Sequence, residues 1–112
     1  RLQPGKRMSQ AVKHGNTVYL AGQVANDPNG TVEQQTREVL AAIDKLLAEA
    51  GTSKSKVLSC QVVLNNIGDF AAMNSVYDQW IDPANPPARA CIEARLAAPA
   101  LKVEIIAVAA LD

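Results

Sequence analysis

The chain has 112 residues, with 11 Lys and Arg, 11 Asp and Glu, and a formal net charge of +0. The length fits one domain spanning residues 1–112, and a hydrophobic share of 48% excludes a disordered chain. The balanced charge argues against a nucleic-acid partner, because binding through phosphates needs an excess of Lys and Arg on one face. Only 4% of the residues are aromatic, so small aliphatic side chains must build the core, and some of them can find their partners on another subunit.

Apolar runs and the number of cysteines indicate the cellular compartment of the protein. No apolar run approaches the ~20 residues that cross a bilayer, so no membrane partner is expected. No secretory leader is recognised at the start of the sequence. The two cysteines, Cys60 and Cys91, are too few for a disulfide framework and lack metal-ligand spacing. A reducing, cytoplasmic location is therefore expected.

The first half of the chain predicts a hairpin and then a helix. His14-Gly15-Asn16 is a tight-turn sequence, followed by a β-branched strand at 17–21. Thr31 and Gln34 fit a capping box, and Gly51 fits the position just after the helix end. Apolar residues recur between them at spacings of three and four. This predicted stripe comprises Val32, Thr36, Val39, Leu40, Ile43, Leu46, Leu47 and Ala50.

The second half predicts a strand at 57–64, a second helix and two closing strands. Asp69 can cap the helix and Asp82-Pro83 ends it. Its predicted apolar stripe comprises Phe70, Met73, Tyr77, Trp80 and Ile81. Along residues 88–96, apolar side chains alternate strictly with Arg, Cys or Glu side chains, which predicts a strand. The strand at 102–111 is apolar on both faces over part of its length, which implies that other parts of the protein cover both faces there.

These elements predict an α+β fold in the order β-β-α-β-α-β-β. Two helices can cover only one face of the sheet, so the other face needs a second cover, and subunit association is the natural candidate. To this uncovered face we assign Arg89, Cys91, Glu104, Ile106 and Val108.

Arg89 is the leading candidate for chemistry. It follows the rigid Asn-Pro-Pro segment at 85–87, and its guanidinium is costly to bury unless an anion meets it. The planar guanidinium suits a carboxylate, which it can bind through two hydrogen bonds. The structural alternative is a salt bridge to Glu93, to Glu104 or to a carboxylate of a partner.

Other candidate residues have more ordinary alternatives. Glu104 could act as a general base or hold a water, or it could merely neutralise Arg89 or Lys102. Cys91 could be a nucleophile, but this needs a base beside it, and the single His14 lies in the hairpin turn. Asn74 lies between the stripe positions of the second helix and faces either a cleft or solvent.

Two segments near the end of the chain carry a distinctive pattern. They are Pro-Ala-Arg-Ala-Cys-Ile-Glu-Ala at 87–94 and Val-Glu-Ile-Ile-Ala-Val-Ala at 103–109. Supporting segments are Ala-Gly-Gln at 21–23, the helix end at 47–51, and Asp-Phe-Ala-Ala-Met-Asn at 69–74 with Tyr77. Together, in this order, they resemble the RidA (YjgF-type) imine deaminase family over nearly the whole chain.

The resemblance implies a chorismate-mutase-like fold and a homotrimer in which three sheets close a central barrel, with a cleft at each subunit interface. It implies a hydrolase of the 2-iminobutanoate/2-iminopropanoate deaminase type, which converts 2-imino acids or enamines to 2-keto acids and ammonia without a cofactor. Arg89 would hold the substrate carboxylate and Glu104 the attacking water. The implied substrate-binding positions are Cys91, Ala21, Gly22, Met8 and Asn74.

Three positions depart from the family pattern. Met8 stands where deaminating members carry Tyr, Ala21 where many carry Ser, and Ile106 where a second acid is common. The departures fit a divergent subgroup with another preferred imine, or a non-catalytic protein that binds a small carboxylate such as a 2-keto acid. A ribonuclease or translation inhibitor, also described for the family, conflicts with the balanced charge and the lack of an aromatic platform.

Overall fold

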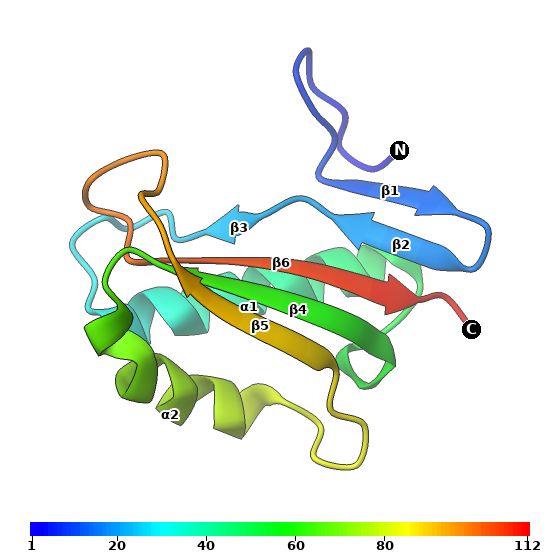
Figure 1. The fold of residues 1–112 in the computed structure, drawn as a ribbon. Helices are drawn as coiled ribbons and strands as arrows, with labels where there is room; N and C mark the ends of the chain where they lie inside the picture. The colour runs from blue at the N-terminus through cyan, green and yellow to red at the C-terminus, as the bar shows by residue number, and fades with distance from the viewer.

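One mixed β-sheet carries both helices of the chain on the same face (Figure 1). The computed structural model describes residues 1–112. Its elements are β1 Ala11–His14, β2 Thr17–Leu20, β3 Gln23–Val24, α1 Val32–Ala50, the 3₁₀ helix η1 Lys54–Lys56, β4 Val57–Leu64, the 3₁₀ helix η2 Ile67–Asp69, α2 Phe70–Trp80, β5 Ala88–Glu93 and β6 Val103–Ala110. The strand order is β1-β2-β6-β4-β5, and β3 also pairs with β6. The predicted α+β order is confirmed, with the short strand β3 as an addition.

The first two strands form the predicted hairpin. β1 pairs antiparallel with β2, from Ala11 opposite Leu20 to His14 opposite Thr17. Gly15 in the turn has a φ of 60°, a value that side chains other than glycine rarely adopt. β2 also pairs with β6, so the hairpin extends the sheet on the side of β6 that faces away from β4.

Helix α1 begins and ends as predicted. The Thr31 hydroxyl accepts from the Gln34 backbone N–H (3.1 Å), and the Gln34 side chain accepts from the Thr31 N–H (2.8 Å). Gly51 ends the helix with a φ of 90°. The buried side of the helix contains the whole predicted stripe. It also contains Gln35, whose amide group donates to the carbonyl of Ala100 and ties the helix start to the loop before β6.

Helix α2 differs from the prediction in its first turn. The Asp69 side chain makes no capping hydrogen bond, and Asn66 Oδ1 instead accepts from the Gly68 N–H (2.8 Å) in the preceding η2. Phe70 is 42% exposed, so its predicted place in the buried stripe is wrong. The reason is its position, because Phe70 faces the edge strand β5 rather than the middle of the sheet. The buried side chains of α2 are Met73, Val76, Tyr77 and Trp80.

The pairing of β4 with its two neighbours decides which side chains share a face. β4 pairs antiparallel with β6 and parallel with β5. Residues directly opposite each other on neighbouring strands point to the same face of a sheet. Cys60 is opposite both Arg89 and Ala107. Because Cys60 and Ala107 are buried beneath the helices, the Arg89 side chain lies on the helix-covered face.

The predicted grouping of site residues on one face is therefore wrong. Arg89 and Cys91 lie on the helix-covered face, whereas Glu104, Ile106 and Val108 lie on the uncovered one. Alternation along a strand separates its two faces, but only the register with the next strand shows which faces match. β5 also ends at Glu93 rather than at residue 96, since the chain then enters the loop that leads to β6.

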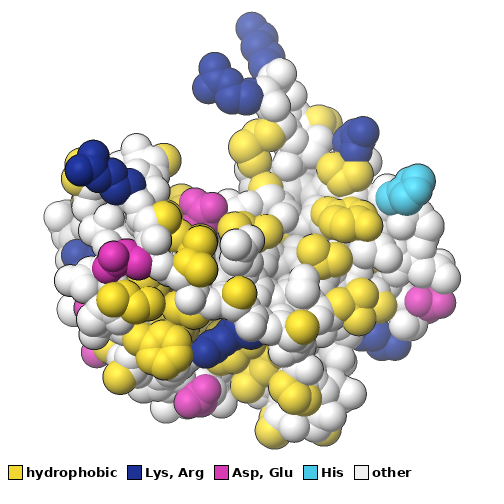
Figure 2. Space-filling view, in the orientation of Figure 1, with side chains coloured by type: hydrophobic (Ala, Val, Ile, Leu, Met, Phe, Trp, Pro, Cys, Tyr) yellow, Lys and Arg dark blue, Asp and Glu magenta, His cyan; other side chains and the backbone are white.

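The face of the sheet turned toward the viewer in Figure 1 carries no helix. Figure 2 shows hydrophobic side chains spread across it. Among them are Ile106 and Val108 of β6, Ile92 of β5, and Tyr19, which is opposite Val108 and 49% exposed. The need for a second subunit on this face stays a prediction. Neither helix of the chain has the length and apolar character to span a membrane.

Candidate functional site

The guanidinium of Arg89 lies against the side of helix α2. Its Nη1 donates a hydrogen bond to Asn74 Oδ1 (2.7 Å), and its central carbon lies 4.7 Å from the centre of the Tyr77 ring. The centre of the Phe70 ring lies 5.8 Å from the same carbon. Asn74, Tyr77 and Phe70 are spaced by three and four residues, so one helix face presents all of them to Arg89.

This arrangement leaves the positive charge of Arg89 without a carboxylate partner inside the chain. Asn74 is a neutral amide, and aromatic faces attract a cation without cancelling its charge. The two carboxylates proposed as salt-bridge partners are placed elsewhere: Glu93 accepts from the Ile67 N–H (2.8 Å), and Glu104 is on the other face. A guanidinium has five N–H donors, so most of them remain free for an anion from outside the chain.

The side chains of Tyr77 and Cys60 lie near the Arg89 guanidinium, and both are uncharged. Burial raises the pKa of the Cys60 thiol to about 11, while the Tyr77 hydroxyl that donates to it and the Arg89 charge lower it less. Burial likewise raises the pKa of Tyr77 to about 12, with the nearby Arg89 charge acting in the opposite direction. Both groups therefore stay protonated near neutral pH, so neither supplies a negative charge to Arg89.

Cys91 lies two residues along β5 from Arg89, on the same face and half-buried. Burial raises its pKa, and the Arg89 charge offsets only part of this effect. Because the thiolate is the reactive form, the environment of Cys91 disfavours the role of nucleophile. No base stands beside it either, since His14 ends β1 and is exposed.

Glu104 forms a second group of site residues, on the uncovered face. It is half-buried and lies opposite Val63 of β4 and Val24 of β3. Its carboxyl group packs against Gly22, where an added Cβ would lie 2.9 Å from Glu104 Cδ and still closer to Oε2. Gly22 therefore leaves the space that the carboxylate occupies, and the structure brings these two predicted site residues together.

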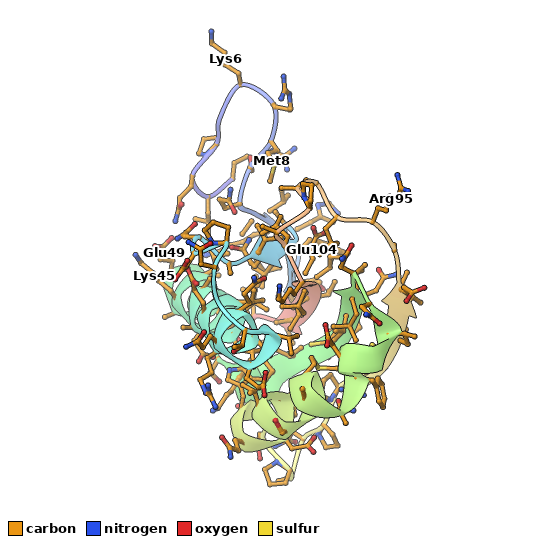
Figure 3. The ribbon with its side chains drawn as sticks, turned by 90° about the vertical axis from the view of Figure 1, so that its left-hand side faces the viewer. Lys6, Met8, Lys45, Glu49, Arg95 and Glu104 are labelled. Carbon is orange, nitrogen blue, oxygen red and sulfur yellow. The ribbon has the colours of Figure 1, made fainter.

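Met8 and Ala21 lie near this second group. Residues 2–10 form an arm that projects from the sheet, and Figure 3 shows Lys6 at its tip and Met8 on the limb that returns above Glu104. Met8 is 50% exposed, and its carbonyl accepts from the Gly5 N–H (2.8 Å). The Ala21 N–H donates to the Gln10 carbonyl (2.8 Å), which joins the base of the arm to the residue that follows β2.

The two groups of site residues thus lie on opposite faces of one sheet. Arg89 also borders a hollow of about 410 Å³ that is lined by residues of β4, β5 and β6, including Ile106 and Val108 of the uncovered face. The structure brings Arg89 and Asn74 together, and Glu104 and Gly22 together, but it does not bring Arg89 to Glu104. The donor groups of the chain include no cluster of three or more His, Cys, Asp or Glu that could hold a metal ion.

Sequence reasoning missed two residues of the Arg89 group. Phe70 and Tyr77 were both predicted in the buried stripe of the second helix, which is confirmed for Tyr77, but neither was assigned to Arg89, although each ring lies beside the guanidinium. A signal was present, because the spacing 70, 74 and 77 places all three side chains on one helical face with Asn74.

Comparisons with known proteins agree with this fold over the whole chain. The family model described as Endoribonuclease L-PSP matches residues 1–111. A RutC family protein from Haemophilus influenzae is 46% identical over 113 residues, covering 97% of this chain and 95% of the relative. The solved structure of an uncharacterized protein from Pseudomonas aeruginosa has a TM-score of 0.97 and 44% identity, covering 100% of this chain and 97% of the other.

A YjgF family member from Neisseria meningitidis is similarly close, with a TM-score of 0.96 and 42% identity, covering 98% of this chain and 92% of the other. The fold is therefore the chorismate-mutase-like α+β fold of these proteins, as the resemblance implied. The chain belongs to the L-PSP family, which includes the YjgF and RutC proteins.

Proposed function

We propose that this protein hydrolyses reactive 2-imino acids, or their enamine tautomers, to 2-keto acids and ammonia. Water adds to the imine carbon, the C=N bond is replaced by C=O, and the nitrogen leaves as ammonia. The observation that carries the proposal is the exposed guanidinium of Arg89, held in place by Asn74 and Tyr77 without a compensating carboxylate. A 2-imino acid presents a carboxylate directly beside its reacting carbon, so binding at Arg89 also fixes the position of that carbon.

Orientation accounts for much of the proposed rate enhancement. An imine is already electrophilic, so a fixed carboxylate and a placed water remove most of the entropic barrier to addition. In this proposal Arg89 holds the carboxylate, and Glu104 positions the water and accepts its proton. Gly22 supports this role, because it leaves room for the Glu104 carboxylate on the face that Ala21 and Met8 border.

A site that uses both Arg89 and Glu104 requires two copies of the chain. Within one chain the two side chains point to opposite faces of the sheet, and a small imino acid cannot reach around it. The apolar uncovered face and the β5 edge offer surfaces for a neighbour. We therefore propose a homotrimer in which Arg89 of one subunit meets Glu104 of the next, with Asn74, Met8, Ala21 and the main chain of Cys91 completing the site.

The test measures ammonia release from imines that an amino acid oxidase generates in situ, relative to spontaneous hydrolysis. The wild-type protein should exceed the Arg89→Ala variant by about a hundredfold or more in kcat/KM. Arg89→Lys should fall between them, since lysine keeps the charge but cannot bind a carboxylate through two parallel hydrogen bonds. A wild-type rate no higher than that of Arg89→Ala would contradict the proposal.

A carboxylate-binding protein without turnover is the second candidate function. It is favoured by the Arg89 site, which is ordered within a single chain, and by Met8, which cannot donate the hydrogen bond that a tyrosine would. Calorimetry with a 2-keto acid would then show saturable binding that requires Arg89, with no ammonia released from imines. RNA cleavage that survives Arg89→Ala would contradict both candidates.

A further inference from the structure

Basic residues gather in the first part of the chain, although the whole chain is neutral. Residues 1–26 contain four Lys and Arg and no Asp or Glu. Residues 27–88 contain eight Asp and Glu and only four Lys and Arg. Both helices belong to this second segment, so the acidic excess accompanies the helices and the basic excess accompanies the arm and the hairpin. The charge of the molecule is therefore unevenly distributed.

The arm of residues 2–10 holds two of the basic residues, Lys6 and Arg7, in a defined place. The Leu2 N–H donates to the Ala11 carbonyl (2.9 Å), and these two residues form an antiparallel bridge that closes the base of the arm. Lys6 and Arg7 lie at the opposite end and are exposed. Figure 2 shows basic side chains projecting from the end of the arm into solvent. Because the arm is closed at its base, its charges stay above the sheet and do not move as on a free tail.

Arg95 supplies a third cation on another side of the Glu104 carboxylate. It is exposed in the loop between β5 and β6. Figure 1 shows this loop and the arm as two separate projections from the sheet. In Figure 3, Lys6 and Met8 lie above Glu104, and Arg95 lies to one side with its side chain directed outward. We call Lys6, Arg7 and Arg95 the rim cations, because they border the approach to Glu104.

The proposed reaction brings two negative charges together. The substrate carries a carboxylate, and the Glu104 side chain that places the water is a carboxylate too, so the two repel each other as the substrate enters. Arg89 offsets this repulsion only after the substrate has reached it. Exposed cations act from further away, because the screening length in water is about 30 Å at 0.01 M salt and about 10 Å at 0.1 M. The rim cations are placed to supply this longer-range attraction.

We propose that Lys6, Arg7 and Arg95 draw the anionic substrate toward the site without contacting it once it is bound. The inference rests on the proposed function and adds a capture step to it. A 2-imino acid also hydrolyses spontaneously in water, so it stays scarce, and below KM the rate follows kcat/KM. Cations that concentrate the anion near the site raise kcat/KM. They leave kcat unchanged, because they attract the bound substrate and the transition state alike.

The experiment measures kcat and kcat/KM for the imine of alanine in about 10 mM and about 1 M NaCl. Lys6→Glu combined with Arg7→Glu should lower kcat/KM about tenfold at the lower concentration. The loss should be less than about twofold at the higher one, where the screening length is about 3 Å. Arg95→Glu should act in the same direction with a smaller effect, since it reverses one charge. Salt also weakens binding at Arg89, so the compared quantity is the ratio of variant to wild type at each concentration.

Arg37→Glu combined with Lys45→Glu is the matched control. Both residues are exposed on α1, which covers the other face of the sheet, and the change in net charge equals that of the arm variant. The kcat/KM of this control should stay within about twofold of the wild type at both salt concentrations. An equal loss in the two double variants would attribute the effect to net charge alone and overturn the inference.

Three further results would overturn it. An arm variant whose kcat/KM ratio to the wild type does not depend on salt would exclude a long-range attraction. A fall in its kcat would show that the arm supports the reacting groups directly. Loss of RNA or anionic-vesicle binding in the arm variant with unchanged kcat/KM would assign the arm to a polyanion instead.

Failure of the proposed function is distinguishable from failure of the inference. If the wild type shows no deaminase activity, calorimetry measures the Kd for pyruvate at the lower salt concentration. An increase of this Kd in the arm variant but not in the control would still support capture by the rim cations. A Kd that is the same in the wild type and the arm variant would overturn it.

Discussion

Arg89 and Glu104 point to opposite faces of the same sheet, although they lie on strands that both pair with β4. The strand register explains this result. Arg89 is opposite Cys60, whose side chain points to the helix-covered face, whereas Glu104 is opposite Val63, three residues further along β4, whose side chain points to the other face. A single chain thus presents one group that can hold an anion and, on its other side, one group that can place a water. The proposed reaction needs both groups within a few ångströms of one carbon.

Mixed oligomers of two inactive variants test this two-chain site. Arg89→Ala and Glu104→Gln should each lack activity alone. When the two proteins are unfolded together and refolded, random trimers should regain about a quarter of the wild-type activity, because one site in four then receives both intact residues. Ammonia release from the mixture, followed against the mixing ratio, gives the measurement.

The control for this experiment mixes the same two variants without refolding, so that subunits exchange slowly. Activity should then stay near the background of the separate proteins at first. Light scattering checks that the refolded mixture forms trimers. If these trimers are inactive, Arg89 of one subunit and Glu104 of another do not act in one shared site.

Replacing Asn74 by Asp should weaken anion binding more than deleting the side chain does. Asn74→Asp puts a carboxylate about where the amide oxygen now accepts from Arg89, so an incoming carboxylate must compete with it. We expect the Kd for a 2-keto acid to rise about tenfold in Asn74→Asp and less in Asn74→Ala. Calorimetry measures both constants. Equal losses in the two variants would show that orientation, not charge, is the contribution of Asn74.

The order of the elements was predictable because each has a strong local signal. The capping box of Thr31 and Gln34, the terminal Gly51 and the turn at Gly15 all stand where the sequence places them. The sequence could not predict which side chains of β5 point toward the helices. A shift of one residue in the pairing of this edge strand with β4 would exchange its two faces and leave the alternating pattern of its sequence unchanged. Phe70 was misplaced for a related reason, since its helical spacing cannot show that the facing strand is the edge of the sheet.

Introducing a methyl group at Gly22 should separate catalysis from binding. Gly22→Ala places a Cβ where the Glu104 carboxylate now lies, and the end of that side chain must move away. We expect kcat to fall about tenfold or more, since a 1 Å displacement of a catalytic group can cost that much. The Kd for a 2-keto acid at Arg89 should change little by comparison.

Gly30→Ala serves as the matched control for Gly22→Ala. An added Cβ at Gly30 meets only the Gln34 and Gln35 side chains at 3.4 to 3.5 Å, an ordinary contact that involves neither Glu104 nor Arg89. Its kcat should stay close to that of the wild type. A fall in kcat of the same size in both variants would attribute the effect to the backbone and not to Glu104.

Stability should decrease in alkaline solution because of Cys60 and Tyr77. Burial raises the pKa of Cys60 from 9.0 to about 11 in the folded protein. Between these values the unfolded chain releases the thiol proton while the folded chain keeps it, so the free energy of unfolding falls as pH rises. The contribution of Cys60 is complete below pH 9 and is lost as pH rises toward 11, with a slope of at most about 1.4 kcal/mol per pH unit.

Urea unfolding between pH 8 and pH 10.5 measures this slope. Cys60→Val removes the titrating group and should flatten the curve from about pH 9 upward, whatever its effect on stability at pH 8. Tyr77→Phe should flatten it only above about pH 10, because the pKa of Tyr77 rises from 10.0 to about 12. A curve for Cys60→Val that runs parallel to the wild type over the whole range would show that the thiol titrates alike in the folded and unfolded chains.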